Sequence, residues 1–267
     1  MNIIITALPG VPLVRPGDDL AALAADALRR AALRPRHGDV LVLAQKIVSK
    51  AEGRQVALAS VVPGKRALDL ARVTGKDARL VELILSESSD VVRARPGVLI
   101  VRHRLGLVLA NAGIDHSNIL ATDDPAGGPT DDPTGDPADE QVLLLPLDPD
   151  ASAERLRRAL RRHLGVDVAV MIIDSLGRAW RLGTVGIAIG VAGMPAFLDL
   201  RGRPDLNGRT LESSELGYAD ELAAAASMAM GQANEARPMV LIQGLPEPGG
   251  EGRAADLVRP RALDLFP

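Results

Sequence analysis

The stretch that most constrains the fold is the apolar run at positions 168–173, which stops at Asp174 and Ser175. The run carries no charge and is rich in β-branched side chains, so it predicts a buried strand. A carboxylate and a hydroxyl at the point where a chain leaves its sheet can contact a ligand without being buried. We therefore expect a strand whose end carries polar side chains available for binding.

Two arginines follow this strand end. Gly177 breaks the chain, and Arg178 and Arg181 lie on either side of Trp180. Together with the preceding carboxylate and hydroxyl they could bind a metal ion and a phosphorylated substrate, because guanidinium groups bind phosphates and hard cations bind carboxylate oxygens. The same residues also fit a strand end with an ordinary surface loop, and this stretch alone does not decide between the two.

Composition excludes several classes of protein. The chain has no cysteine, which rules out disulfides, thiolate metal sites and a cysteine nucleophile. Aromatic residues make up only 1%, so the core must consist of Leu, Val, Ile and Ala. The net charge of -3 gives no general attraction to nucleic acid or to an anionic membrane. No signal peptide is visible at the start, and we expect a cytoplasmic protein.

Two segments invite other interpretations. The uncharged segment 182–198 is shorter than the about 20 residues that a membrane helix needs, and glycines interrupt it, so we interpret it as strand and tight turns. A predicted helix at 152–164 carries five outward arginines. The negative net charge and the lack of aromatic stacking residues argue against a nucleic-acid interface there. We expect neither a membrane nor a nucleic-acid partner.

The remaining periodicity predicts alternating strands and helices in a chain long enough for two lobes. No P-loop pattern occurs. Asp18 and Asp19 are predicted to cap the first helix, and Ser152 the fourth. Strands are expected at 3–7, 38–44, 98–101, 106–110 and 239–243, and helices at 20–31, 66–72, 77–86, 152–164 and 214–230. Ordered structure is expected to resume at 142–145.

Two further polar segments follow predicted strands. After the strand at 38–44 come Lys46, Ser49, Lys50 and Arg54, which could bind phosphates, although this segment taken alone is better explained by an exposed amphipathic helix. After the strand at 106–110, Gly113 permits a sharp turn. That turn presents oxygen ligands of the kind that Mg²⁺ prefers, from Asn111, Asp115, Ser117 and Asn118. His116 could act as a base or ligand, but a single histidine is more often incidental.

Two segments lack the pattern of a packed element. Positions 122–140 are acidic and rich in proline and glycine, which is typical of a mobile insertion. Positions 245–267 form a Pro/Gly-rich tail that we expect to be loosely ordered.

Taken in this order, the segments resemble the coenzyme F420-0:L-glutamate ligase family, the γ-glutamyl ligases of the deazaflavin coenzyme. One of the motifs on which this resemblance rests is Asn111-Ala-Gly-Ile-Asp-His-Ser-Asn. The others lie at 38–54, 144–150, 173–190 and 205–209. The resemblance runs from about position 8 to 244, and several motifs in one order are more specific than any single one.

The resemblance implies an α+β fold of mixed and antiparallel sheets with flanking helices, in two lobes, neither Rossmann nor P-loop. It places a ligase-like domain at 1–244, including the acidic insertion, and leaves 245–267 as a tail. It implies that GTP drives the addition of L-glutamate to the terminal carboxylate of F420-0 through an acyl phosphate, followed by γ-linked glutamates. It also implies two Mg²⁺ or Mn²⁺ ions, with K⁺ as a further candidate, and a homodimer.

The resemblance also assigns site residues, by their positions within the matching motifs. The resemblance implies metal ligands at Asp115, Asp174, Ser175 and Gln232. It implies nucleotide contacts at Val11, Pro12, Leu13, Val14, Gln45, Lys46, Lys50, Asn118, Met230, Gly231, Gln232, Ala233, Asn234, Glu235, Ala236 and Arg237. The catalytic candidates are Lys50, on the nucleotide's phosphates, and Arg178 and Arg181, whose chemistry suits an anionic substrate or the acyl phosphate.

Two features depart from the family pattern. The acidic insertion is longer than we expect of archaeal relatives, and Gln232 is a neutral amide at a metal position that can also be glutamate. Two other functions stay open: another nucleotide-dependent amide ligase on the same scaffold, and a non-catalytic GTP-binding regulator.

Overall fold

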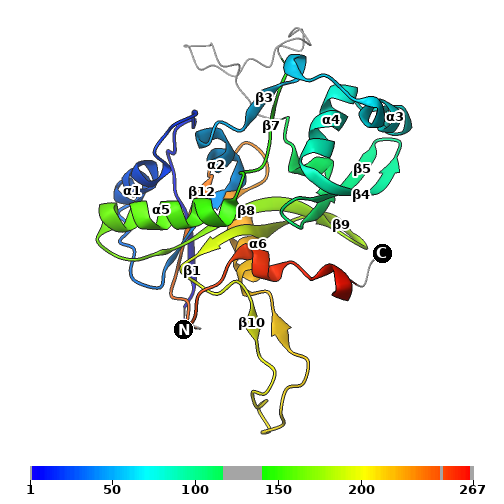
Figure 1. The fold of residues 1–267 in the computed structure, drawn as a ribbon. Coiled ribbons are helices and arrows are strands. Elements are labelled where there is room, and N and C mark those ends of the chain that lie inside the picture. The colour runs from blue at the N-terminus through cyan, green and yellow to red at the C-terminus, as the bar shows by residue number, and fades with distance from the viewer. Residues whose placement is uncertain (1, 117–139, 247–248, 265–267) are drawn as a thin grey trace. The chain divides into compact units, whose positions relative to one another are not determined.

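The computed structural model describes residues 2–116, 140–246 and 249–264. The chain divides into two compact units (Figure 1). The first consists of Met1–Ala51 with Leu147–Pro267, and the second is the inserted segment Glu52–Pro146. Helices and mixed sheets make up both, so the predicted α+β class is confirmed. Asn118 and all of the predicted insertion except Glu140 lie outside the described residues.

The first unit is built on a five-stranded sheet. Its strand order is β1-β12-β2-β8-β9, and only the β2–β8 pair is parallel. The predicted strands near both ends of the chain and at 38–44 are confirmed. The bounds are β1 (Ile4–Ala7), β2 (Val40–Ala44), β8 (Ala169–Arg178), β9 (Arg181–Ala192) and β12 (Met239–Gln243).

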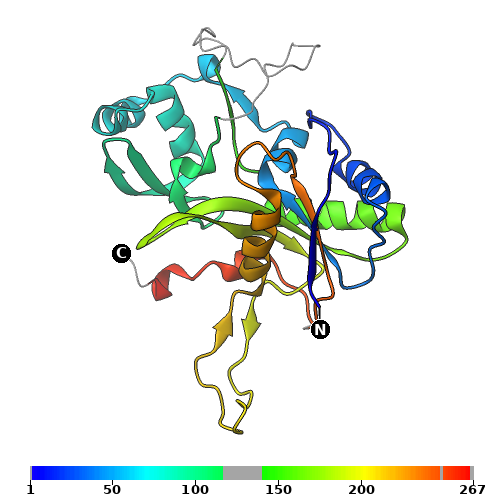
Figure 2. The same cartoon turned by 180° about the vertical axis from the view of Figure 1, so that it is seen from behind.

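Helices cover both faces of this sheet. Figures 1 and 2 show α1 (Leu20–Arg30) and α5 (Pro149–Leu164) on one face and α6 (Tyr218–Met230) on the other. The strands in the middle of the sheet are therefore buried on both sides, which explains their uninterrupted apolar sequences. Alternate residues of these strands, such as Val42 and Met171, belong to the apolar core that also contains the buried residues of α6. The short helix α2 (Gln45–Ala51) follows β2 without a loop.

Of the helix caps predicted from the sequence, one is confirmed and one is wrong. Asp19 caps α1 as expected, accepting hydrogen bonds from the N–H groups of its second and third following residues. The prediction that Ser152 caps α5 is wrong. That helix begins at Pro149, and Asp148 is its cap. The Ser152 hydroxyl instead donates to the Asp148 carbonyl within the first turn (2.9 Å).

Glycines in β9 let helices approach both faces of the strand. A Cβ atom on Gly186 would lie 2.5 Å from the Ala223 carbonyl oxygen of α6. A Cβ atom on Gly190 would overlap the Pro149 carbonyl of α5. The two glycines face opposite sides because a register shift opposite Ile172 and Ile173 inserts one extra residue between them. The uncharged segment 182–198 is thus largely a packed strand, as its sequence indicated.

The expected end of the central strand is wrong in one respect. We predicted that the chain leaves the sheet at Asp174 and Ser175, but β8 continues to Arg178. Its neighbour β2 pairs with β8 only as far as Ile173, and beyond that point β8 pairs with β9 alone. Asp174 and Ser175 therefore lie where the five-stranded sheet narrows to a two-stranded ribbon.

A second ribbon projects from this unit. The strands β10 (Leu198–Asp199) and β11 (Glu215–Leu216) pair antiparallel, and the chain between them extends away from the sheet (Figures 1 and 2). At its turn, the Asp205 carboxylate accepts hydrogen bonds from the N–H groups of Asn207 and Arg209, both 2.8 Å. The motif at 205–209 thus forms a hydrogen-bonded turn at the end of this arm.

The second unit has its own core. Helices α3 (Lys65–Thr74) and α4 (Ala78–Ser86) pack with an antiparallel sheet of β4 (Ser88–Arg95), β5 (Val98–His103) and β6 (Val108–Ala110). The strands β3 (Gln55–Ala57) and β7 (Gln141–Leu143) form a separate pair. Leu58, Ile84 and Leu99 are fully buried in this core. Both predicted helices and the predicted strand pair are confirmed here.

The C-terminal segment is more ordered than we expected. Residues Ala254–Leu257 form a 3₁₀ helix, and the Asp150 carboxylate accepts hydrogen bonds from the Ala254 and Ala255 N–H groups (2.8 and 3.2 Å). Arg157 bonds Glu251 (2.9 Å) and holds Asp167 with two further hydrogen bonds. The prediction of a loose tail is wrong for this part. Within the described ranges, no helix is long and apolar enough to cross a membrane.

Candidate functional site

Four segments of the chain meet at one edge of the five-stranded sheet. Ala44, the last residue of β2, pairs with Ile173 of β8, and its N–H donates to the Pro238 carbonyl (2.9 Å). The N–H of Leu8, which follows β1, donates to the Met239 carbonyl at the start of β12 (2.8 Å). The turn after β1, the start of α2, the polar pair on β8 and the loop before β12 therefore converge.

The polar pair on β8 sits at this edge. Successive strand residues point to opposite faces, and Ser175 faces α6 because it pairs with Gly186, against which α6 packs. The Ser175 hydroxyl donates to the Gln232 side-chain oxygen (2.8 Å). Asp174 is half-buried, and its carboxylate accepts a hydrogen bond from the Ser175 N–H (2.8 Å). Two of the four predicted metal ligands, Ser175 and Gln232, thus contact each other in the first unit, and Asp174 precedes Ser175 on the same strand.

The loop after α6 is held in a defined conformation. Gly231 has φ +79°, and a Cβ atom there would overlap the Glu235 side chain. The Glu235 carboxylate accepts a hydrogen bond from the Ala233 N–H (2.8 Å), which lowers the pKa of that carboxyl. This geometry keeps all the predicted nucleotide-contact residues from 230 to 237 in one compact turn beside Ser175.

The predicted nucleotide contacts in the turn after β1 and in α2 belong to two of these four segments. In the turn after β1, Val14 is buried and Leu13 is 60% exposed. In α2, Gln45 and Lys50 are buried, and the Ser49 hydroxyl donates to the Gln45 side-chain oxygen (2.9 Å). A buried lysine must be compensated by negative charge or hydrogen bonds. Lys50 therefore does not belong to an exposed helix face.

The two arginines of β8 and β9 face each other at the hairpin end. Arg178 of β8 lies opposite Arg181 of β9 in the antiparallel strand pair. The Arg178 Nη1 atom is buried and has no hydrogen-bond partner within the part of the chain that the structure describes. A buried guanidinium nitrogen without an acceptor is costly, and an anionic ligand would supply one.

Asp115 belongs to the second unit, where its backbone is fixed. Its N–H donates to the Leu143 carbonyl (3.0 Å) and its carbonyl accepts from the Leu143 N–H (2.9 Å). The preceding Asn111, Ala112 and Gly113 all have positive φ angles of 52–68°. Two non-glycine residues in that region cost about 1–2 kcal/mol each. Strain of this kind gathers at functional sites, and here it directly precedes a predicted metal ligand.

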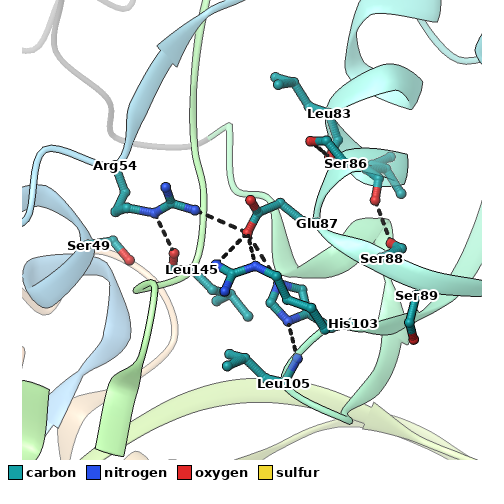
Figure 3. A network of polar contacts seen from close by, with 12 residues as sticks. Ser49, Arg54, Leu83, Ser86, Glu87, Ser88, Ser89, His103, Leu105 and Leu145 are labelled. Atoms are coloured by element: carbon teal, nitrogen blue, oxygen red, sulfur yellow. Dashed lines mark hydrogen bonds and ion pairs between the residues drawn. The ribbon is translucent and has the colours of Figure 1, made fainter. Parts of the chain in front are cut away.

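One polar cluster was missed from the sequence. Glu87 accepts hydrogen bonds from Arg54 and Arg104 (both 3.0 Å), and His103 Nε2 lies 3.5 Å away (Figure 3). The sequence grouped Arg54 with phosphate-binding lysines, and that grouping is wrong, because Arg54 also donates to the Leu145 carbonyl (2.9 Å). No sequence signal links these residues, since they come from separate elements.

A metal ion would have to bind mainly oxygen atoms. Among the residues that the structure describes, no three His, Asp or Glu side chains gather around a common point. The side chains of Asp174, Ser175 and Gln232 supply a carboxylate, a hydroxyl and an amide oxygen, all hard ligands. Mg²⁺ commonly binds one or two carboxylates and completes its shell with water and substrate phosphates. This donor set fits such an ion.

Comparison with known proteins gives a consistent result. The profile described as F420-0:Gamma-glutamyl ligase matches residues 10–244. A coenzyme F420:L-glutamate ligase of Methanothermobacter thermautotrophicus is 44% identical over 268 residues, covering 100% of this chain and 99% of the relative. Relatives of that name from Archaeoglobus fulgidus and Methanocaldococcus jannaschii are 38% and 39% identical, covering 100% and 86% of this chain and 97% and 84% of their own lengths.

Proposed function

Because this chain belongs to the F420-0:gamma-glutamyl ligase family, we propose that it joins L-glutamate to the terminal carboxylate of the coenzyme precursor F420-0. GTP supplies the energy, and γ-linked glutamates follow. The observation that carries this proposal is the convergence at one sheet edge of the four segments described above. A hydroxyl–amide pair, a carboxylate and a buried lysine gather there.

The chemistry requires that the carboxylate be activated. In water a carboxylate does not condense with an amine, because its oxygen is a poor leaving group. In the proposed reaction, a carboxylate oxygen of F420-0 attacks the γ-phosphorus of GTP and GDP leaves, which gives an acyl phosphate. The α-amine of glutamate then attacks the carbonyl carbon and releases phosphate. Catalysis of the first step consists mainly of alignment and charge neutralisation.

We assign the residues to these steps by their charge. Lys46 and Lys50 hold the phosphates of GTP, and the turns at 11–14 and 230–237 hold the rest of the nucleotide. Arg178 and Arg181 bind the anionic substrate, which gives the buried Arg178 Nη1 atom its acceptor. When bound, a divalent ion would supply positive charge that neutralises the phosphates. Asp174, Ser175 and Gln232 would hold it, and the family likeness adds Asp115 from the second unit.

The experiment is a phosphate-release assay in which F420-0, glutamate or the divalent metal is omitted in turn. We expect the full rate only with all of them, and a glutamylated coenzyme by mass spectrometry. Asp174→Asn should lose activity and Mn²⁺ binding while its circular dichroism is unchanged. Asp26→Asn, an exposed surface change on α1, is the matched control. An active Asp174→Asn enzyme would refute the metal assignment, and GTP binding without phosphate release would favour a regulator.

A further inference from the structure

The short helix α2 carries a buried pair of polar side chains one turn apart. Ser49 is fully buried, with 0% of its surface exposed, and Gln45 is 4% exposed. The Ser49 hydroxyl donates to the Gln45 side-chain oxygen (2.9 Å). The sequence grouped Ser49 with residues that could bind phosphates. Because this hydroxyl is buried and already donates to Gln45, Ser49 is not placed to donate to a phosphate itself.

The acceptor that Ser49 uses differs from the usual one in a helix. A helical serine commonly donates to the backbone carbonyl of the residue four positions before it. For Ser49 that residue is Gln45, yet the hydroxyl bonds the side chain of Gln45 and not its backbone. A bond to the backbone would leave the glutamine side chain free to turn. The observed bond fixes the amide group of Gln45 instead.

The amide group of Gln45 has two chemically different ends. Its oxygen accepts hydrogen bonds, and its NH2 group donates them. Since Ser49 holds the oxygen, the NH2 group is the end that is turned away from Ser49. Gln45 is the first residue of α2 and follows Ala44, at the sheet edge where the four segments converge. A ligand that meets this amide therefore meets a hydrogen-bond donor.

We propose that Ser49 is a positioning residue for the nucleotide, which fixes the Gln45 amide so that its NH2 group donates to an acceptor oxygen of GTP. This inference rests on the proposed function, in which GTP binds at this edge. GTP offers acceptor oxygens on its phosphates and at O6 of guanine, whereas ATP carries a donor amino group in place of O6. A fixed donor binds one of these oxygens, and if that oxygen is O6 it also selects against ATP.

The test measures Kd for GTP with the full chain by titration calorimetry, together with KM and kcat in the phosphate-release assay. Ser49→Ala should raise Kd and KM for GTP roughly three- to tenfold, as for the loss of one neutral hydrogen bond, with little change in kcat. Gln45→Glu keeps an oxygen for Ser49 but removes the donors, so it should weaken GTP further. Ser86→Ala, which removes an exposed hydroxyl on α4, should change neither constant.

A double-mutant cycle separates positioning from packing. If Ser49 acts through Gln45, Ser49→Ala should have no further effect on Kd for GTP in a chain that also carries Gln45→Ala. Equal losses of affinity in both backgrounds would mean that Ser49 only supports the packing of α2, and the proposal would be wrong. It would also be wrong if Gln45→Glu bound GTP as tightly as the wild type, because the amide would then present its oxygen. Circular dichroism melts check that every variant is folded.

A nucleotide analogue identifies the oxygen that Gln45 contacts. The triphosphate of 2-aminopurine riboside lacks O6 and keeps all three phosphates. If O6 is the acceptor, Ser49→Ala should weaken GTP and leave this analogue unchanged, and if a phosphate oxygen is the acceptor, both should weaken equally. A Ser49→Ala chain that binds both nucleotides like the wild type would overturn the inference and leave the ligase proposal intact. A wild-type chain that binds GTP but forms no glutamylated product would overturn the ligase proposal alone.

Discussion

Glu87 is a carboxylate held among three cationic or polar groups in the second unit. Burial by itself would raise its pKa, but the hydrogen bonds from His103 and Arg104, together with the charges of Arg104 and Arg54, outweigh burial and lower the pKa from 4.5 to about 2. The ionised form is therefore the one that the folded structure stabilises.

Glu87 should make stability depend on pH in the acid range. Because the folded pKa lies below the unfolded value, its stabilisation is complete above about pH 4.5 and is lost as the pH falls toward 2. Glu87→Gln should lower the free energy of unfolding at pH 7 by roughly 1–3 kcal/mol, since the arginines then donate to a neutral amide oxygen in place of a carboxylate. Urea titrations at pH 7 and pH 3 check this, with the exposed Glu212→Gln as control. A difference that does not shrink at pH 3 would contradict it.

At the scale of the element, the glycines of β9 determine how closely the helices pack. A methyl group at Gly186 would lie 2.5 Å from the Ala223 carbonyl and 2.6 Å from Ser227 Cβ. We expect Gly186→Ala to lower the free energy of unfolding by about 1–3 kcal/mol, because α6 must move or strain. Gly177→Ala, on the same ribbon, is the matched control, since no atom lies within 4 Å of its added methyl group. Equal melting temperatures for the two variants would show that α6 does not pack as described.

Local signals predicted most of the elements. The Asp19 cap, the helices α3 and α4 and the strand pair β5–β6 follow from side-chain periodicity, which acts within a few residues. The continuation of β8 beyond Asp174 could not be predicted in this way. Its polar sequence indicates a loop, and only pairing with the distant β9 keeps it extended.

The candidate site, too, could be predicted from local sequence only in part. Asp174 and Ser175 were visible as polar residues at the end of an apolar run, but their neighbour Gln232 was assigned only through the family resemblance. The contact between Ser175 and Gln232 depends on how α6 crosses the sheet, which no local pattern encodes. The Glu87 cluster was missed for the same reason, because its members come from positions 54, 87, 103 and 104.

At the scale of the whole molecule, the second unit is an insertion whose two ends are joined to each other. The Arg54 carbonyl accepts a hydrogen bond from the Leu144 N–H (3.1 Å), and the Arg54 side chain donates to the Leu145 carbonyl (2.9 Å). The β3–β7 pair continues this connection. The unit also has an apolar core of its own. A segment with its own core and adjoining ends has the features of an independently folding domain.

We therefore expect residues 52–146, expressed alone, to fold. The fragment should show a single cooperative melt by circular dichroism and a dispersed amide NMR spectrum. Arg54→Gln should lower its melting temperature, since the substitution removes bonds to both Glu87 and Leu145. Arg72→Gln, at an exposed pair on α3, should have little effect, because such surface pairs contribute about 0–1 kcal/mol. A fragment without a cooperative transition would mean that its core depends on the remainder of the chain. In that case the two units fold as one, and the closure of the inserted segment by Arg54 does not by itself make it a domain.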